Sequence, residues 1–399
     1  MSKNLSSIII PTQYFSPEIF QINDLCTWLS HRYKVIVIAP QPSYPSRKDI
    51  DKKNTKAFNR NVKIIRLPVF KRDGSLFGFF LNQITFLLTS IPITVFYTII
   101  KNPKYIVVPQ YSPFTCILPA FFASFFNKSE LIIWVFDLWP ESIRLFRKNK
   151  IYFDVFYKLL ITITNFILSR FHKILISSPK FRYADSLKSS KNIINLNSWE
   201  PQNKAFANKI IVNKPKEIII SSVGNIGNAH DINLIKQFLI VADKLETKIN
   251  FAGGGSKLSL LKEFVLNEDI NNVFFHNYIS KDKANALISN SHFSLIPFKK
   301  SEISDTIPYR FVTSLAFSTP LLSFNETYIS KIIKKNEIGI CFDNKLNKLS
   351  FEENFSLIEK FISDLYQLDF KMLSSNTANF FDNNYSYKSS DKKLTKIFN

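Results

Sequence analysis

The stretch EIIISSVGNIGNAHDINLIKQF at residues 217–238 predicts a strand, a loop and the start of a helix. The β-branched run over 217–223 predicts a strand, and the residues from Asp231 onward predict a helix. Gly224 to Asn228 lies between them and predicts a tight loop. Repetition of such units is typical of a parallel sheet covered by helices, so this stretch predicts the α/β fold class.

The same alternation continues in both directions along the chain. Upstream strands are predicted at 6–10, 34–39, 62–67, 105–108, 131–136 and 174–177, all compatible with one sheet. Downstream strands are predicted at 248–252, 272–275, 293–297 and 320–323, with helices starting near Ser256, Lys281, Pro308 and Thr327. The Pro, Asn and Lys-rich segment 197–215 indicates a linker, so we predict two Rossmann-like domains, at 1–200 and 201–375, and a tail at 376–399.

Composition limits the classes of function. The chain has 399 residues, 46% of them hydrophobic, and a net charge of +21, which indicates an anionic partner such as a nucleotide, a phospholipid or a nucleic acid. Cys26, Cys116 and Cys341 lie far apart and support neither a disulfide framework nor a zinc site. The apolar run near Met1 is too short for a signal peptide, so we expect a cytoplasmic location.

Two apolar stretches in the first half suggest contact with a membrane. Residues 76–100 carry no charge and are long enough to cross a bilayer, but they contain many polar residues and Pro92. A membrane span, a buried core helix and a helix lying on the membrane all remain open. Residues 152–171 are amphipathic and follow a basic segment that contains Arg144 and Lys150, which suits either an anionic membrane surface or a buried helix beside a solvated loop.

Loops that follow strands are where ligands bind in such folds, and three stand out in the second half. Gly224, Asn225 and Gly227 would let backbone N–H groups approach a phosphate, although a plain tight turn has the same sequence. Gly253 and Gly254 belong to a run that holds three of the eight glycines. The third loop and the helix after it contain Asp305, Pro308 and Arg310, whose guanidinium suits phosphate oxygens, and His230 follows the first loop.

In the first half, Asp137 and Glu141 follow an apolar strand and are framed by Trp139 and Pro140. Such a pair can orient sugar hydroxyls or transfer protons, whereas a simple cap is the alternative for Asp137. Neighbouring loops offer further polar and aromatic candidates for an acceptor site: Tyr14, Glu18, Asn23, Tyr44 and Tyr111.

Taken in order, these motifs resemble a known family. YFSPE, PSYP, WVFDLWPES, VGNIG, AGGG and TIPYR, spread from Tyr14 to Arg310, are similar to motifs of the GT-B glycosyltransferases of family 4, in the branch for capsule, O-antigen and exopolysaccharide assembly. The resemblance implies two Rossmann-like domains facing a cleft, with the acceptor on the first and the nucleotide sugar on the second. It also implies that the tail at 376–399 returns to the first domain.

The resemblance implies roles for individual residues. Gly224, Asn225, Gly227 and Arg310 would face the donor diphosphate, Arg310 standing where a Lys is usual. Gly253 and Gly254 would border the nucleotide, and Asp137 would lie in the catalytic cleft.

The sequence also departs from the family's pattern. Asp305 and Thr313 replace the two acids of the usual Glu-x7-Glu motif. Phe136 stands where a His often precedes the cleft Asp, and Phe20 and Gln21 replace paired glycines.

We therefore predict a retaining glycosyltransferase that needs no metal or other cofactor. Its donor would be a nucleotide sugar, with a UDP-sugar favoured, and its acceptor a polyprenyl-linked glycan at the inner face of the cell membrane. The alternative is an inactive homologue that binds a nucleotide sugar or a partner enzyme. A nucleic-acid partner is not expected, because no recognition module accompanies the charge.

Overall fold

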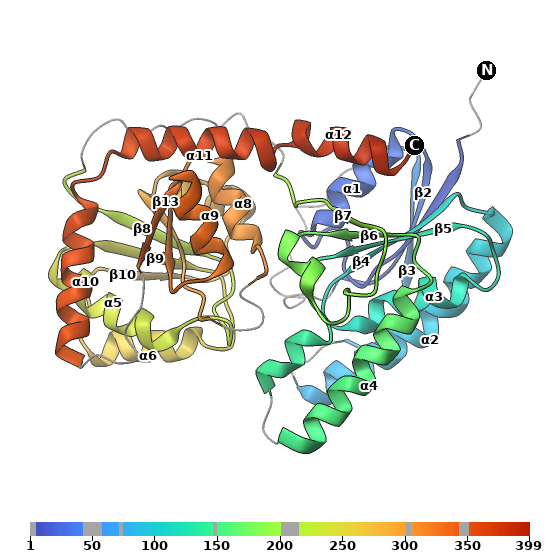
Figure 1. Cartoon of the computed structure of the whole chain (residues 1–399), viewed down its shortest axis with the longest axis horizontal. Coiled ribbons are helices and arrows are strands. Elements are labelled where there is room, and N and C mark those ends of the chain that lie inside the picture. Colours follow the sequence, from blue (N-terminus) through green and yellow to red (C-terminus); the bar gives the residue numbers. More distant parts are fainter. Residues whose placement is uncertain are drawn as a thin grey trace. The chain divides into compact units, whose positions relative to one another are not determined.

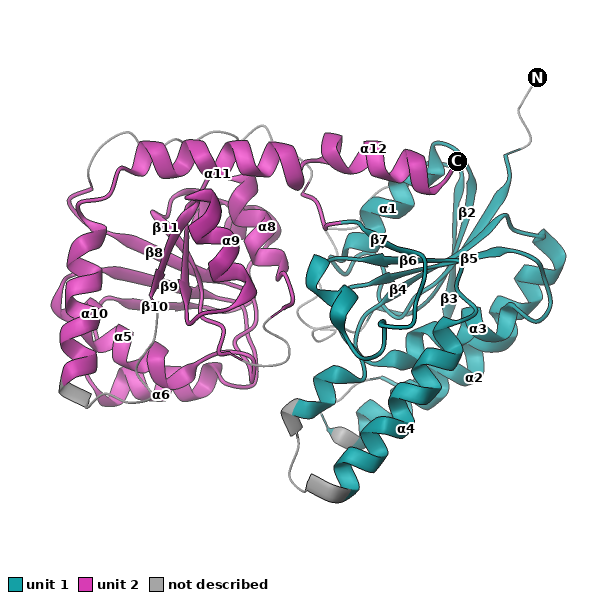
Figure 2. Cartoon of the chain, in the orientation of Figure 1, with its two compact units in different colours: residues 1–196 teal, residues 197–399 magenta. Residues whose placement is uncertain are grey.

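The computed structural model describes residues 5–42, 58–71, 75–146, 150–200, 215–300, 305–342 and 351–399. The chain forms two compact units, Met1–Leu196 and Asn197–Asn399 (Figure 2). Each unit is an α/β structure built on a parallel sheet (Figure 1).

Unit 1 has seven strands among its described residues, in the order β3-β2-β1-β4-β5-β6-β7. The strands are β1 (Ser7–Pro11), β2 (Lys34–Pro40), β3 (Val62–Leu67), β4 (Tyr105–Gln110), β5 (Glu130–Val135), β6 (Lys173–Ile176) and β7 (Ile193–Asn195). The helices are α1 (Gln21–Ser30), α2 (Leu76–Lys101), α3 (Leu118–Ala123) and α4 (Lys150–Leu168), with short 3-10 turns η2 (Phe114–Ile117), η3 (Glu141–Phe146) and η4 (Pro179–Tyr183). The single predicted sheet is confirmed, and β7 is an addition to it.

The central strands are buried on both faces, as their continuous Ile and Val runs dictate. Ile8, Ile9 and Ile10 of β1 are fully buried, and so are Ile106, Val107 and Val108 of β4. β1 pairs with β4 through Ile8 and Ile9, so strands from before and after α2 share one sheet. A spanning α2 would place these strands on opposite sides of a membrane, so the span is excluded although Phe77–Lys101 is long and apolar enough for one.

Unit 2 repeats the topology with the order β10-β9-β8-β11-β12-β13 among its described strands. The strands are β8 (Ile219–Val223), β9 (Lys248–Ala252), β10 (Val273–His276), β11 (Phe293–Ile296), β12 (Leu321–Phe324) and β13 (Gly339–Phe342). The helices are α5 (Ile232–Lys244), α6 (Leu258–Asn267), α7 (Lys281–Ser289), α8 (Tyr309–Ala316), α9 (Tyr328–Asn336), α10 (Phe351–Leu365), α11 (Phe370–Asn384) and α12 (Tyr387–Ile397).

The helices of unit 2 start where their sequence signals place them. Asp231 caps α5 by accepting from the Leu234 N–H, and Thr327 and Ser330 form a capping box at α9. The tail is helical almost to its end, through α11 and α12. Its return to the first domain stays a prediction.

Candidate functional site

Both sheets reverse their strand order at one point, between β1 and β4 in unit 1 and between β8 and β11 in unit 2. Ligands of open parallel sheets bind beyond the carboxyl ends of the strands at such a point. In unit 2 the loops at this edge contain the predicted donor residues, and in unit 1 they contain most of the predicted acceptor residues. The edges are therefore the candidate sites.

The two glycine loops of unit 2 are held together by backbone contacts. Gly224 N–H donates to Ala252 O at 2.8 Å, and Ile226 N–H donates to Gly254 O at 2.8 Å. A Cβ on Gly253, whose φ is +123°, would lie 2.7 Å from Gly224 O, and a Cβ on Gly255 would lie 2.2 Å from Ile226 O. Loop packing thus explains Gly253 and Gly255 without any ligand.

This packing also changes the expected role of the backbone. The N–H groups of Gly224, Ile226 and Gly253 donate to carbonyls of unit 2, and that of Gly227 donates to the His230 ring at 3.1 Å. These four N–H groups of the two glycine loops therefore already have hydrogen-bond acceptors within unit 2. Side chains at this edge must supply more of any contact to an anion than the sequence suggested.

Arg310, in the first turn of α8, is the cation of this edge. Its guanidinium donates to Ser222 Oγ at 3.1 Å and to Asn225 O at 2.6 Å, and it lies against Gly224, where a Cβ would come within 3.0 Å of it. Burial lowers the pKa of Arg310 to about 10, so it stays charged at neutral pH. Within the described ranges, no carboxylate forms an ion pair with it.

His230 lies beside this cation and is 8% exposed. Burial, with a smaller effect from Arg310, lowers its pKa to about 3, so the imidazole is neutral. Nδ1 lies 3.1 Å from the Gly227 nitrogen and 3.2 Å from the Gly227 carbonyl oxygen, so it can accept from the one or donate to the other, and Nε2 is buried without a hydrogen-bond partner in the described part of the chain. The ring is thus neutral and lies close to Arg310.

The other predicted donor residues lie just before α8 or within it. Pro308 is the N-cap of α8 rather than its first residue, and Asp305 is half-buried before it. Thr313 is 7% exposed and its hydroxyl donates to Tyr309 O at 3.1 Å, so no carboxylate stands at this position of the helix.

Three residues that contact the predicted site residues or the start of α8 were missed by the sequence analysis. Ser222 holds Arg310, and the Tyr278 hydroxyl donates to Asn225 Oδ1 at 3.1 Å and lies over Gly254. The buried Glu200 carboxylate accepts from the Tyr309 hydroxyl and from Lys281 Nζ, which fixes the start of α8. No local signal identified them, because their partners are 53 to 109 residues away in sequence.

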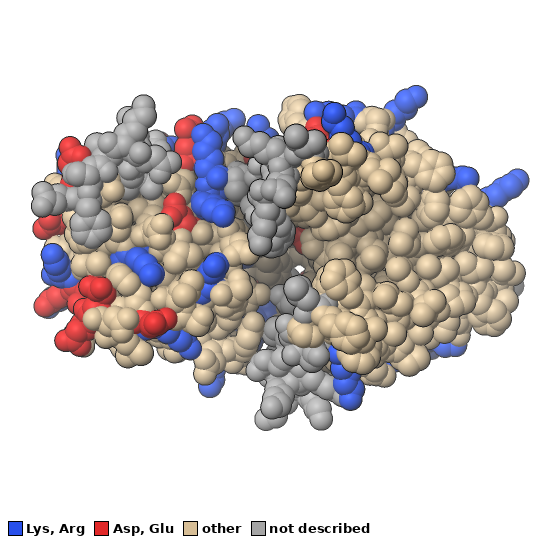
Figure 3. All heavy atoms as spheres, turned by 90° about the horizontal axis from the view of Figure 1, so that it is seen from below, with Lys and Arg blue, Asp and Glu red and all other residues tan. Residues whose placement is uncertain are grey.

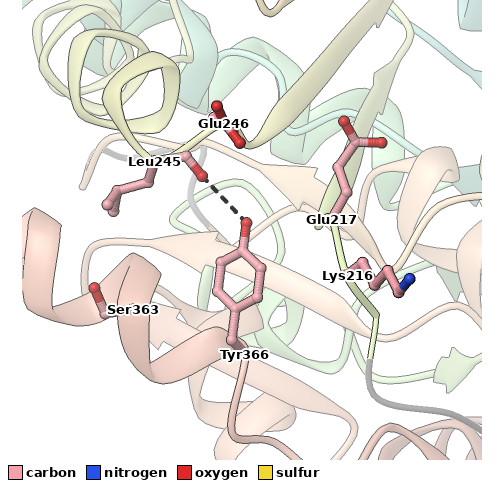
Figure 4. Close-up of a pocket in the computed structure, with 6 residues that line it drawn as sticks. All are labelled: Lys216, Glu217, Leu245, Glu246, Ser363 and Tyr366. Carbon is pink, nitrogen blue, oxygen red and sulfur yellow. Dashed lines mark hydrogen bonds between the residues drawn. The ribbon is translucent and has the colours of Figure 1, made fainter.

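A hollow of about 350 Å³ in unit 2 is a different feature. It is lined by Lys216, Glu217, Leu245, Glu246, Ser363 and Tyr366 (Figure 4). It adjoins the amino ends of β8 and β9, at the sheet edge opposite the glycine loops, and Tyr366 there donates to Leu245 O at 3.2 Å. We therefore do not assign the donor to it.

At the carboxyl edge of unit 1, aromatic rings from three loops pack together. Tyr14 stacks on Phe20 at 4.7 Å, and Tyr111 stacks on Phe136 at 4.8 Å, with Phe20 edge-on to Tyr111 at 4.8 Å. Phe20 and Phe136 are two of the departures from the family's pattern. The structure shows that both contact Tyr111, so this aromatic cluster accounts for the two departures together.

Asp137 follows β5 and is half-buried next to this cluster. Burial raises its pKa above the usual range, and the Ser112 N–H, which donates to Oδ2 at 3.0 Å, partly offsets that effect. A carboxylate with a raised pKa at the switch point can accept a proton or orient a hydroxyl.

The remaining acceptor candidates have internal partners. Both oxygens of Glu141, which is 5% exposed, accept from Ser186, and this favours a structural role over the predicted catalytic one. Glu18 accepts from the Phe15 N–H, and Asn23 donates to Glu18 O, which stabilises their loop. Trp139 is half-buried, and Tyr44 lies outside the described residues.

Comparison with known proteins supports a glycosyltransferase. Residues 203–364 match the family model "Glycosyl transferases group 1", which includes both glycine loops and Arg310. A search of curated proteins finds no match.

Solved structures share the fold over nearly the whole chain. Anabaena Alr3699/HepE, solved with UDP and glucose, has a TM-score of 0.66 and 9% identity, covering 98% of this chain and 99% of its own. Sucrose-phosphate synthase from Thermosynechococcus elongatus has a TM-score of 0.70 and 10% identity, covering 98% of both chains. The lipopolysaccharide outer core galactosyltransferase WaaB has a TM-score of 0.62 and 12% identity, covering 98% and 99%. The predicted GT-B fold is confirmed.

Proposed function

We propose that this chain is a retaining glycosyltransferase that transfers a sugar from a nucleotide-diphosphate donor, a UDP-sugar, to a lipid-linked glycan during assembly of a surface polysaccharide. The observation that carries the proposal is Arg310, a cation without a carboxylate partner among the described residues, beside the glycine loop at the switch point of unit 2. Its location is the cytoplasmic side of the membrane.

The electrostatics of Arg310 call for an anion. The Arg310 side chain is half-buried, and partial removal of a charge from water is unfavourable unless an opposite charge or several hydrogen bonds compensate. Ser222 and Asn225 supply two neutral acceptors, and a diphosphate would supply the missing charge. A guanidinium can bind two phosphate oxygens at once, which also orients the group.

The same group suits the reaction. In the proposed step the bond between the anomeric carbon and the β-phosphate oxygen breaks, and a bond from the acceptor hydroxyl to that carbon forms on the same face. The hydroxyl proton passes to the departing diphosphate. Negative charge grows on the diphosphate, so Arg310 stabilises the transition state more than the ground state. No metal or other cofactor is required in this scheme.

In this proposal unit 1 binds the acceptor. Asp137 orients its hydroxyl, and Tyr14, Tyr111 and Trp139 contact its sugar rings. The bound UDP of the HepE structure supports the donor class, and the lipopolysaccharide enzyme WaaB among the fold neighbours supports the pathway class.

A second candidate is a GT-B protein that binds a nucleotide sugar or a partner enzyme without catalysing transfer. Thr313, which points its hydroxyl into α8 where the resembled family has a Glu, favours it. Phe136, which fills the place of a His, favours it as well.

Thermal unfolding with a panel of nucleotides tests the donor site. A ligand at 100 times its dissociation constant adds about 2.7 kcal/mol to the free energy of unfolding. We expect one nucleoside diphosphate to raise the midpoint of the wild type selectively. Arg310→Met should weaken that binding at least tenfold, and Arg310→Lys, which keeps the charge and loses the planar fork, should be intermediate. An equal shift in all three proteins, or no shift with any nucleotide, would contradict the site.

A further inference from the structure

Helix α2 presents an apolar stripe to the outside of unit 1. Phe77, Phe80, Ile84, Leu88, Phe96 and Ile99 are all more than half exposed, and Leu88 reaches 70%. They follow one another at intervals of three, four or eight residues, with the exposed Pro92 between Leu88 and Phe96, so they lie on one face of the helix. α2 carries no charge before Lys101.

The opposite face of α2 is buried and mixes polar residues with the fully buried Phe86. Asn82, Gln83, Ser90, Thr94 and Thr98 are at most 5% exposed. Gln83 Oε1 accepts from Thr115 at 2.6 Å, and Asn82 donates to Phe70 O at 2.6 Å. A surface helix in water turns polar side chains outward, whereas α2 keeps polar side chains on its buried face and exposes apolar ones. The outer face of α2 is therefore suited to a medium other than water, and its burial as a core helix is excluded.

Helix α4 adds a second stripe of the same kind. Its exposed apolar residues are Tyr152, Val155, Phe156, Leu159, Ile163 and Phe166. Phe121 of α3 packs edge-on against Phe166, and Val95 of α2 joins the core cluster that contains Phe121 and Ile167, so α2, α3 and α4 cover one face of the sheet. Figure 3 shows a broad uncharged expanse on this side of unit 1, with Lys and Arg at its margin.

The charges near this face favour an anionic surface. The exposed Lys101 ends α2, the exposed Lys128 and Arg170 follow α3 and α4, and Arg170 lies over the Phe125 ring at 4.7 Å. Within α4 the exposed Asp154 and Lys158 carry opposite charges. Basic residues beside apolar ones contribute about 1 kcal/mol each near an anionic leaflet. A protein interface of this size usually brings its own hydrogen-bonding groups, whereas the two stripes consist of apolar side chains and the Tyr152 ring.

We infer that the face formed by the α2 and α4 stripes inserts into the outer part of an anionic lipid bilayer, with both helices lying along the membrane. The helices of a parallel sheet begin at its carboxyl edge, so the amino ends of both stripes lie on the edge that carries Asp137. Membrane contact would thus bring a lipid-linked molecule to that edge. The inference rests on the geometry of unit 1 and does not depend on the proposed reaction.

Vesicle flotation of the full-length protein tests this directly. The probe is a set of phosphatidylcholine vesicles with and without 30% phosphatidylglycerol. The anionic lipid is varied because each basic residue contributes ~1 kcal/mol to binding only near a negatively charged leaflet. We expect the wild type to float with the anionic vesicles and to remain bound at high salt, because apolar insertion is not screened. Leu88→Gln combined with Leu159→Gln should lower the partition coefficient at least tenfold.

The matched control is Leu260→Gln combined with Leu266→Gln. These leucines of α6 in unit 2 are also exposed, so the control removes the same side chains from another surface. It should float as the wild type does, and nucleotide binding should be unchanged in both variants, which separates this test from that of the donor site.

Three results would overturn the inference. One is a wild type that stays with the soluble fraction at every lipid composition. Another is flotation of the Leu88/Leu159 variant equal to that of the wild type. The third is a stable dimer or a complex with another protein that the Leu88/Leu159 variant abolishes, because a protein would then be the occupant of the face.

Discussion

At the scale of single residues, the candidate sites combine groups whose charged forms are disfavoured by burial. The guanidinium of Arg310 has a lowered pKa, the carboxyl of Asp137 a raised one, and the imidazole of His230 a strongly lowered one. Burying such groups lowers the stability of the native state. They are common at functional sites because a bound ligand or a transition state compensates the unfavourable burial of the charge.

Asp137→Asn should raise stability and abolish most activity. Because the folded-state pKa is raised, the native protein loses stability as pH rises through the range where Asp137 ionises, and the cost is fully present above the native pKa. Asn removes that cost and keeps an oxygen for the Ser112 N–H. We expect a higher unfolding midpoint at pH 7 and a loss of transfer on the order of 10²-fold.

Asp185→Asn is the matched control, with the opposite sign. The hydrogen bond from Lys188 is the main cause that holds the pKa of Asp185 below its usual value, so its charged form stabilises the native state above that range. This variant should lower the midpoint at pH 7 and leave transfer unchanged. If Asp137→Asn also lowered the midpoint, the assigned burial cost would be wrong.

His230 predicts a specific acid sensitivity. Its pKa of about 3 in the native state lies below that of the unfolded chain, so the unfolded state binds the proton first as pH falls. Stability is fully present above about pH 6.5 and declines toward pH 3, by up to about 1.4 kcal/mol per pH unit.

His230→Gln should remove that slope, as judged by urea unfolding of variant and wild type at several pH values. The exposed His31→Gln, at the end of α1, serves as the control and should keep the slope of the wild type. Identical slopes in wild type and His230→Gln would show that His230 is not buried as a neutral ring.

At the scale of elements, the strands were the most predictable feature. β3 and β9 have the predicted bounds, because Pro68 follows β3 and three glycines from Gly253 follow β9. β7 and β13 were missed because they have three and four residues and lack such a run. For α2 the composition allowed three placements, and only the pairing of β1 with β4 and the exposed stripe distinguish them.

The glycine loops give a prediction that separates packing from ligand contact. Gly255→Ala places a Cβ 2.2 Å from Ile226 O at a φ of +116°, and should cost more than about 2 kcal/mol of stability. Gly227→Ala meets Ser256 Oγ at an ordinary 3.6 Å and should change stability by less than about 1 kcal/mol.

Calorimetric titration of the Gly227→Ala variant with the donor nucleotide is the measurement. If the bound donor contacts this loop, the affinity of the Gly227→Ala variant for the donor nucleotide should be at least tenfold lower than that of the wild type, although the variant is stably folded. Unchanged affinity would remove Gly227 from the donor site, and the unfolding of Gly255→Ala in urea provides the comparison for stability.

At the scale of the whole molecule, two units of one topology place their chemistry by one rule. The strand order reverses beside β1 in unit 1 and beside β8 in unit 2. Asp137 lies at the carboxyl edge of the first sheet, and Arg310 lies at the carboxyl edge of the second. The sequence did not predict the strand order, but it located these residues because each lies in the segment that follows a predicted strand. The contacts of Ser222, Tyr278 and Glu200 needed the structure, because they join segments that are distant in sequence.

The most direct test of the account is sugar transfer by the purified full-length protein. Labelled nucleotide sugars would be offered one at a time with polyprenyl-diphosphate glycolipids in anionic vesicles, and label would be counted in the lipid phase. We predict transfer from one nucleotide sugar, reduced on the order of 10²-fold in Arg310→Met and partly retained in Arg310→Lys. Transfer that is undiminished in Arg310→Met, or tight donor binding with no transfer or hydrolysis of any donor, would contradict the account.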